Sequence, residues 1–358
     1  MIASGRAAVW VLLGPHAGDN NQVLALAEAT DLPFRPIQLR YKWFAHVPAV
    51  CRSSAIHQLA DDCRSEIAAP WPSIVLGIGQ RSAPVARYIQ RASGGIAKTV
   101  RLGDPMVSHR LFDLVITTTQ YAVRDARNVI RLPITITEQG QVRLTKDEER
   151  WLAASPHPRR LLVLGGKTSL WRFDPSVVTD CLRSLQRRAA VEGGSVLAVT
   201  SPRTAPNLVA AAQSVLGRQA VVTREFPRYS ALLYGADEIH VTGDSVSMLS
   251  DAVASGKPVG LVPLQPDALG KIIGWAGTVR GRSFRMRDLE RFWTDLRTRG
   301  LVGTVEEPRC GKLDIAPVDL AVGAVRGLLD GKVPSVQTLP PSEPERAGGS
   351  AAAEPIAL

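Results

Sequence analysis

The chain has 358 residues, 45% of them hydrophobic and 21% charged, which is the composition of a globular protein and excludes a largely disordered one. Such a length is too great for one ordinary hydrophobic core and predicts two domains. Lys and Arg outnumber Asp and Glu by 43 to 33, a net charge of +10, which favours an anionic partner such as a nucleotide, a phosphorylated substrate or a membrane surface. We expect no nucleic-acid partner.

Neither the cysteines nor the apolar runs indicate a metal site or a membrane span. Four widely separated cysteines without a C-x-x-C pair predict reduced thiols and no structural metal: Cys51, Cys63, Cys181 and Cys310. The apolar run 7–13 ends at Gly14 and is too short for a signal sequence, and no stretch approaches the ~18 residues of a membrane span. We therefore expect a cytoplasmic protein, with peripheral attachment to the inner membrane left open.

The first half alternates strand and helix patterns. Strands are predicted at 7–13, 34–39, 73–79, 98–102, 114–117 and 127–132, and helices at 23–29 and 80–92. Strand, glycine turn, helix and strand form the opening of a doubly wound fold, whose ligands lie beyond the carboxyl ends of the strands. Four polar residues after the first strand are thus predicted at the rim of a cleft: His16, Asp19, Asn20 and Gln22. An N-cap role for Asp19 is the alternative.

A charged helix at 146–154 and the segment Ser155-Pro156-His157-Pro158 precede a second run of the same kind. We place the domain boundary there, with an N-terminal domain at 1–155 and a C-terminal domain at 159–330. Strands are predicted at 159–166, 195–200, 219–223, 238–241 and 257–262. Residues 331–358 are mostly Pro, Ser, Glu, Gly and Ala and predict a disordered tail.

Two turns of the second half carry phosphate-binding chemistry. The first contains Gly165, Gly166, Lys167, Thr168 and Ser169, where glycines allow close backbone approach to a diphosphate. It is not a Walker motif, because Leu161 stands where that pattern needs glycine. The second turn places Arg203 after a strand, and guanidinium binds phosphate bidentately. Plain β–α turns are the alternative for both.

The stretch 237–259 is the most informative part of the chain. A strand at 238–241 leads into a turn and a short helix, for which Asp244 and Ser245 are N-cap candidates and Gly256 suits the left-handed C′ position. The N–H groups at such a helix start can hold a phosphate or a ribose hydroxyl. An ordinary strand–helix–strand unit is the alternative.

Residues 280–299 carry seven Arg against three acidic residues, interleaved with apolar residues at helical spacing. A basic amphipathic helix can lie on an anionic membrane surface. The alternative is that its apolar stripe packs onto its own domain and its arginines are solvated.

Several segments together resemble the mitochondrial fission ELM1 family over about residues 7–330. They are VWVLLGPHAGDNNQVLALAEA, LGIGQRSAP, VLGGKTS, TSPRTAP and, most specifically, ADEIHVTGDSVSMLSDAVASGKPV. One departure is Asp251, where the family pattern has Glu. The family in turn resembles glycosyltransferases of the GT-B type, which implies an α/β fold of two Rossmann-like domains facing a central cleft.

The resemblance also implies roles for the residues. The C-terminal domain would bind a nucleotide-sugar donor, through Gly165, Gly166, Lys167, Thr168, Ser169, Arg203, Thr242, Gly243, Asp244, Ser245, Val246, Ser247 and Asp251. The N-terminal domain would bind the acceptor, with His16 or Asp19 as general base beside Gly14, Gly18, Asn20, Gln22, Arg81 and Ser82. No metal and no cofactor is implied beyond the nucleotide-sugar co-substrate, since helix dipoles and basic side chains stabilise the leaving diphosphate.

Three functions are consistent with this sequence. The preferred one is a metal-independent glycosyltransferase, transferring a sugar from a nucleotide-sugar to an acceptor at or near the membrane. The alternatives are a non-catalytic, membrane-associated adaptor of the fission-factor type and a nucleotide-sugar epimerase. The sugar, the base, the acceptor, the stereochemical course and the oligomeric state are left open.

Overall fold

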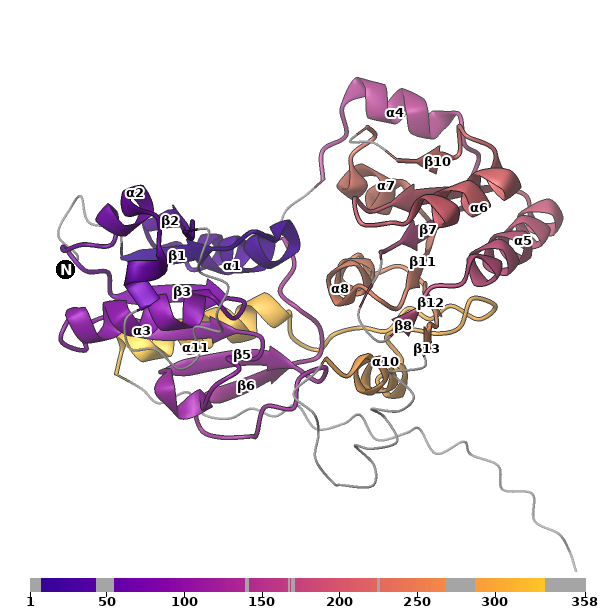
Figure 1. Cartoon of the computed structure of the whole chain (residues 1–358). Helices are drawn as coiled ribbons and strands as arrows, with labels where there is room; N and C mark the ends of the chain where they lie inside the picture. The colour runs from indigo at the N-terminus through magenta and orange to yellow at the C-terminus, as the bar shows by residue number, and fades with distance from the viewer. Residues whose placement is uncertain are drawn as a thin grey trace, which may run out of the picture.

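The computed structural model describes residues 8–42, 55–138, 142–166, 168, 171–223, 226–267 and 287–331. They form two bodies, each built on a parallel β-sheet (Figure 1). The N-terminal sheet has the strand order β2-β1-β3-β4-β5-β6, and the C-terminal sheet has the order β10-β9-β7-β11-β12. The expectation of two Rossmann-like α/β domains is confirmed.

The elements of the N-terminal body follow the predicted alternation. Its strands are β1 (Val9–Leu13), β2 (Phe34–Gln38), β3 (Ile74–Ile78), β4 (Lys98–Leu102), β5 (Leu114–Thr118) and β6 (Val129–Leu132). Its helices are α1 (Ala17–Ala29), α2 (Asp61–Ser65) and α3 (Ser82–Ala92), with 3-10 turns η2 (Ala55–Gln58) and η3 (His109–Leu111).

The C-terminal body repeats the pattern with one strand fewer in its sheet. Its strands are β7 (Arg159–Leu164), β9 (Ser195–Thr200), β10 (Val221–Val222), β11 (Glu238–Thr242) and β12 (Val259–Val262), beside the antiparallel pair β8 (Trp171–Arg172) and β13 (Gln265–Pro266). The helices that follow in the chain are α4 (Lys146–Ala153), α5 (Pro175–Glu192), α6 (Pro206–Leu216), α7 (Tyr229–Gly235), α8 (Val246–Ala254), α10 (Leu289–Thr298) and α11 (Pro317–Leu329).

Each sheet is buried on both faces, which is why its strands read as continuous apolar runs. In β1, Val9 and Val11 pack into one cluster, whereas Trp10 and Leu12 pack into another. Because successive side chains of a strand point to opposite faces, these two clusters lie on opposite sides of the sheet. The β7 strand divides its residues between two clusters in the same way.

Two helices pack against the body opposite to the one that the linear boundary predicts. Helix α11 was expected in the C-terminal domain, but Val318, Ala321 and Val325 lie in the core beneath the N-terminal sheet (Figure 1). Helix α4 was expected in the N-terminal domain, but Leu152 lies in the C-terminal core. The chain therefore crosses between the bodies twice, once before α4 and once before α11. A single boundary at 155–159 allows only one crossing.

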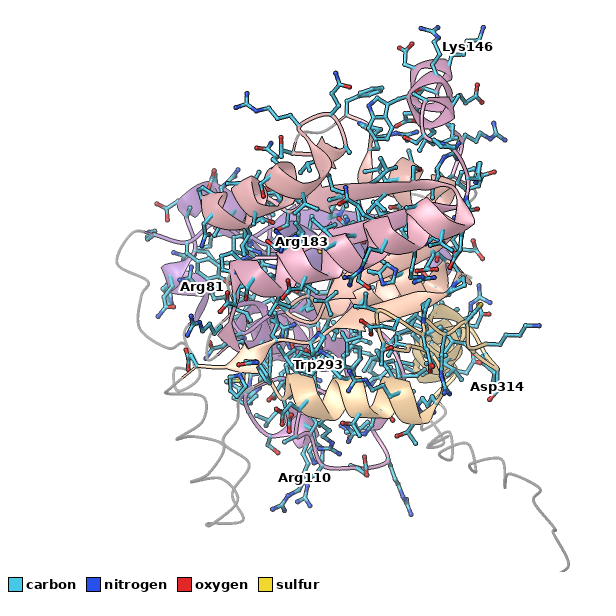
Figure 2. All side chains as sticks on the ribbon, turned by 90° about the vertical axis from the view of Figure 1, so that its right-hand side faces the viewer. Arg81, Arg110, Lys146, Arg183, Trp293 and Asp314 are labelled. Carbon is cyan, nitrogen blue, oxygen red and sulfur yellow. The ribbon has the colours of Figure 1, made fainter. Side chains whose placement is uncertain are left out.

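The described part of the basic segment packs inward. Leu289, Phe292, Trp293 and Leu296 of α10 are buried in the C-terminal core, and Figure 2 shows Trp293 on the side of α10 that faces the protein. Of the two alternatives for this segment, the described part therefore follows the one in which the apolar stripe packs onto its own domain. Residues 280–286 lie outside the described residues, as does all of the expected tail at 331–358 except its first residue. Within the described ranges, no helix combines the length and hydrophobicity that a bilayer crossing requires.

Candidate functional site

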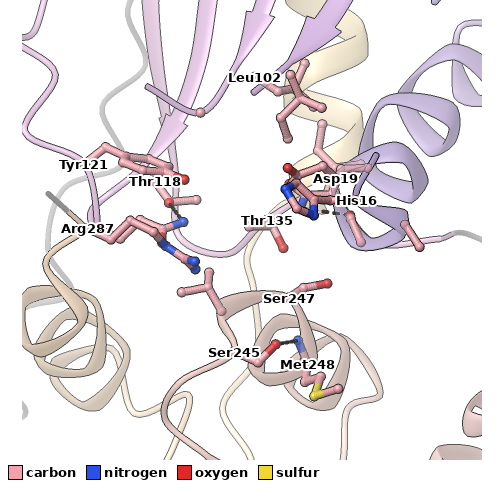
Figure 3. Close-up of a pocket in the computed structure, with 18 of the residues that line it drawn as sticks. His16, Asp19, Leu102, Thr118, Tyr121, Thr135, Ser245, Ser247, Met248 and Arg287 are labelled. Carbon is pink, nitrogen blue, oxygen red and sulfur yellow. Dashed lines mark hydrogen bonds between the residues drawn. The ribbon is translucent and has the colours of Figure 1, made fainter. Parts of the chain in front are cut away.

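A cavity of about 690 Å³ lies between the two bodies, where strands of both sheets end (Figure 3). Its N-terminal wall consists of the first turn of α1 and residues at the ends of β3, β4 and β5. Its C-terminal wall consists of residues after β9 and the start of α8. Ligands of doubly wound folds bind at this edge, because the carboxyl ends of parallel strands converge there.

The start of α8 forms the centre of the C-terminal wall. Ser245 is the N-cap, and its Oγ accepts a hydrogen bond from the backbone N–H of Met248 at 3.4 Å. Val246 and Ser247 line the cavity, and their N–H groups have no partner within the helix. Gly256 has φ +68° and follows the helix, as predicted for the C′ position. The wall therefore presents the positive end of a helix dipole.

Asp244 connects this helix start to the glycine turn after β7. Its carboxylate accepts hydrogen bonds from Thr242 Oγ1 at 2.7 Å and from the Gly166 N–H at 2.8 Å. Gly165 donates its N–H to Thr242 Oγ1 at 2.9 Å. Burial raises the pKa of Asp244 above its ordinary value, against the effect of the bonds from Thr242 and Gly166.

The two glycines of the turn after β7 allow other parts of the protein to approach the backbone closely. A Cβ at Gly165 would lie 2.0 Å from an Asp244 oxygen, and one at Gly166 would lie 2.4 Å from the Arg203 carbonyl oxygen. The N–H of Gly165 is bonded to Thr242, and the N–H of Gly166 is bonded to Asp244. Neither glycine lines the cavity and both N–H groups have protein partners, so the predicted contact of Gly165 and Gly166 with a diphosphate stays a prediction without support from this geometry.

The first turn of α1 forms the facing wall. His16 is the N-cap of α1, and its side chain makes no hydrogen bond to the N–H groups of the first turn. Asp19 lies within the first turn and lines the cavity, so the alternative N-cap role for it is wrong. A Cβ at Gly18 would lie 3.8 Å from Ser247 Oγ. Two helix N-termini therefore meet across one cavity, with His16 and Asp19 on one side and Ser245 and Ser247 on the other (Figure 3).

Nine of the predicted residues line this cavity: His16, Gly18, Asp19, Gln22, Arg203, Asp244, Ser245, Val246 and Ser247. Two others, Lys167 and Ser169, lie outside the described residues. The remaining ones are absent from the described lining: Gly14, Asn20, Arg81, Ser82, Gly165, Gly166, Thr168, Thr242, Gly243 and Asp251.

Several of these absent residues have structural partners. Asn20 closes the turn after β1 through two hydrogen bonds with the backbone of Gly14, at 2.8 and 3.0 Å. The Arg81 guanidinium lies 5.2 Å from the centre of the Tyr41 ring. Ser82 Oγ accepts from the fully buried Arg101 at 2.5 Å. These contacts hold the turns that carry the cavity-lining residues.

Asp251 lies one helical turn beyond Ser247 on α8 and is half-buried. Burial and the nearby charge of Glu138 together raise its pKa from 3.8 to about 7. Ser250, its neighbour in sequence, accepts a hydrogen bond from the Thr135 N–H at 3.1 Å, where the chain leaves the N-terminal sheet. Asp251 is therefore placed near the connection between the bodies.

Several other polar residues line the cavity that the sequence did not indicate, among them Thr118, Tyr121 and Arg287. Thr118 is the last residue of β5 and Tyr121 follows that strand, so the rule that predicted His16 after β1 could have found both. Nothing in the local sequence distinguishes Arg287 from the other arginines of its segment.

The fold and the site define a two-domain α/β protein of the GT-B plan, with a cavity between its domains. The chain belongs to the mitochondrial fission ELM1 family, whose sequence profile matches residues 17–308. Comparison with curated proteins yields no match.

Solved structures with similar folds include several nucleotide-sugar proteins. The S. aureus MnaA–UDP structure is 12% identical, covers 92% of this chain and 99% of its own, and has a TM-score of 0.51. UDP-GlcNAc 2-epimerase from Neisseria meningitidis bound to UDP-GlcNAc is 11% identical, with coverages of 90% and 100% and a TM-score of 0.46. Arabidopsis thaliana UGT89C1 complexed with UDP-L-rhamnose is 12% identical, with coverages of 91% and 95% and a TM-score of 0.43.

Proposed function

We propose that this protein is a glycosyltransferase that binds a nucleotide-sugar in the cavity between its two domains and transfers the sugar to an acceptor. The observation that carries the proposal is the pair of helix N-termini facing each other across the cavity, with Arg203 beside them. Helix N-termini and guanidinium groups together suit a diphosphate, which carries concentrated negative charge.

The C-terminal wall binds the donor in this proposal. The N–H groups of Val246 and Ser247 and the side chains of Ser245 and Arg203 hold the diphosphate, and they stabilise the charge that develops when the nucleoside diphosphate leaves. Asp244 positions Arg203 indirectly, because it holds the glycine turn against which the Arg203 backbone packs. Asp251 is proposed to accept hydrogen bonds from ribose, which requires that it become accessible when donor binds.

The N-terminal wall binds the acceptor and supplies the base. His16 or Asp19 accepts the proton of the acceptor hydroxyl as its oxygen attacks the anomeric carbon. Both side chains line the cavity opposite Ser245 and Ser247, so they can face the sugar of a donor bound on α8.

Calorimetric titration of the full-length protein tests donor binding. UDP and UDP-sugars are the first probes, because the structures compared above were solved with such ligands. We expect binding that weakens by about tenfold or more in Arg203→Gln, the size of one lost charge-assisted hydrogen bond. Arg218→Gln is the matched control, since Arg218 is exposed and lies outside the cavity lining. Unchanged affinity in Arg203→Gln would overturn this donor site.

The same preparation separates the three functions. A transferase consumes its donor only when an acceptor is present, whereas an epimerase converts a donor sugar with no acceptor, which proton NMR of the sugar detects. A protein that binds none of the nucleotides tested supports the adaptor. Vesicle flotation would then show whether it associates with anionic membranes.

A further inference from the structure

Arg287 is carried by the C-terminal part of the chain but is fixed against the N-terminal wall. Its Nε donates to the side-chain oxygen of Gln120 at 2.9 Å, and the N–H of Asp288 donates to the Gln120 carbonyl at 2.8 Å. Gln120 is only 3% exposed, and its amide also donates to Thr118 Oγ1 at 3.0 Å. A buried amide that is hydrogen-bonded through both its oxygen and its nitrogen therefore sets the direction of the Arg287 side chain.

The charge of Arg287 is not neutralised by any carboxylate in the described part of the chain. Its one hydrogen bond there uses Nε and a neutral acceptor, so both terminal nitrogens remain for a ligand. Two terminal N–H groups in the plane of a guanidinium match two oxygens of a phosphate or a carboxylate. Arg287 lines the cavity, and Figure 3 shows it beside Tyr121 and Thr118.

Tyr121 completes this part of the wall. Its ring packs against Gly103, where a Cβ would lie 3.4 Å from it, and the tyrosine lines the cavity. Burial raises the pKa of Tyr121, which keeps its hydroxyl protonated and able to donate a hydrogen bond, while the charge of Arg287 opposes that rise. Arg287, Tyr121 and Thr118 thus offer donors to one anionic group.

Arg203 and Arg287 belong to different walls. Arg203 follows β9 and lies with the start of α8, on the wall proposed to hold the donor diphosphate. Arg287 is held by Gln120, which follows β5 on the wall proposed to hold the acceptor. A donor diphosphate bound at the start of α8 would be the ligand of Arg203, and Arg287 would then still lack an anionic ligand.

We propose that the acceptor is itself an anion, bearing a phosphate or carboxylate group that Arg287 binds together with Tyr121 and Thr118. This proposal rests on the proposed function and names the substrate class of its second subsite. Both substrates would then be negatively charged, in agreement with the net charge of +10.

The test titrates the full-length protein, saturated with UDP, with three matched sugars: glucose 6-phosphate, glucuronate and neutral glucose. We expect the two anions to bind more tightly than glucose. Arg287→Gln should weaken anion binding by about tenfold or more, as expected for a charge-assisted bond, while UDP affinity stays within about twofold. Arg287→Lys should restore part of the loss, because it keeps the charge and loses the bidentate geometry.

Arg291→Gln is the control, an exposed arginine on the same segment that does not line the cavity. Thermal unfolding confirms that each variant is folded. Equal binding of the anions to wild type and Arg287→Gln would overturn the proposal. Loss of UDP affinity in Arg287→Gln would also overturn it, by assigning Arg287 to the donor diphosphate.

Two further arms distinguish this proposal from the proposed function and locate the anion. If the wild-type protein does not bind UDP, the proposed donor site is wrong. Binding of glucose 6-phosphate without UDP that depends on Arg287 would still support the anion subsite. Flotation with phosphatidate-containing vesicles that is lost in Arg287→Gln would place the anionic group on a lipid. Arg287-dependent binding in solution without flotation would place it on a soluble acceptor.

Discussion

The indole Nε1 of Trp293 donates a hydrogen bond to the backbone carbonyl of Gly243 at 3.1 Å, and the indole ring lies directly against the glycine Cα. Trp293 is held in turn by Trp171, whose ring centre is 5.0 Å away in an edge-on arrangement. Gly243 lies one residue before Asp244 and two before the N-cap of α8. Helix α10 therefore supports the turn from which the cavity wall begins.

Gly243→Ala should destabilise the protein and weaken UDP binding. The new Cβ would lie 2.4 Å from a carbon of the Trp293 ring, and overpacking a rigid buried ring costs about 1–3 kcal/mol. Thermal unfolding with and without UDP measures both effects. Gly323→Ala is the control, because no atom lies within 4 Å of the Cβ it would add and Ala favours the helix. A Gly243→Ala variant as stable as wild type would contradict this support.

Phe292→Ala should lower the free energy of unfolding of the C-terminal body by about 3–5 kcal/mol, the range for removing a buried aromatic ring. Phe292 is 0% exposed within the core. Arg291→Gln, next to it on the solvent side, should change stability by no more than about 0.5 kcal/mol. Urea unfolding followed by tryptophan fluorescence compares the two. If Phe292→Ala were equally stable but lost vesicle binding, α10 would be a membrane-binding helix instead.

Acid should destabilise the protein through Glu238. Burial alone would raise its pKa, but hydrogen bonds from His240 at 2.6 Å and from Arg188 at 2.7 and 2.8 Å outweigh burial and lower it from 4.5 to about 2. The folded state therefore binds this proton less readily than the unfolded state, and the stabilisation is present above pH 4.5 and lost as the pH falls towards 2.

Glu238→Gln should flatten that acid limb and lower stability at neutral pH, since Arg188 loses a bidentate carboxylate. Melting temperatures measured across the acid range for wild type and variant check the prediction. Parallel acid profiles for the two proteins would show that other carboxylates govern acid unfolding.

Deprotonation of Asp251 should destabilise the protein. Its folded-state pKa is raised by burial and by Glu138 from 3.8 to about 7, so stability falls as the pH rises from 3.8 to about 7 and no further above it. Asp251→Asn should melt at a higher temperature than wild type at about pH 8, and the gain should shrink as the pH is lowered. Asp314→Asn, at an exposed position, should show no such dependence. An Asp251→Asn gain that does not vary with pH would contradict a raised pKa of the Asp251 carboxyl.

Local features of the fold were predictable because they depend on neighbouring residues. The strand–helix alternation, the N-cap at Ser245 and the left-handed Gly256 follow from apolar periodicity, cap chemistry and glycine geometry. The position of His16 and Asp19 in the cavity followed from one general rule, that ligands bind beyond the carboxyl ends of parallel strands.

The same reasoning was incomplete where a residue meets a distant segment. Gly165 and Gly166 have the composition of a phosphate turn, yet Asp244, 78 residues beyond Gly166, takes the N–H of that glycine. Arg81 and Ser82 follow β3 as a cleft-lining residue would, but their partners are Tyr41 and Arg101. Sequence spacing does not indicate whether a buried donor bonds to a ligand or to a distant group of the protein itself.

The sequence by itself determined two α/β halves, the strand ends that line the cavity and the helix start that suits a phosphate, because periodicity and capping act within a few residues. Only the tertiary structure decided that α11 returns to the N-terminal sheet, that α10 supports Gly243, and that Gln120 holds Arg287 in the cavity. Those contacts join segments far apart in the chain, and they are fixed by the packing of complete helices and sheets.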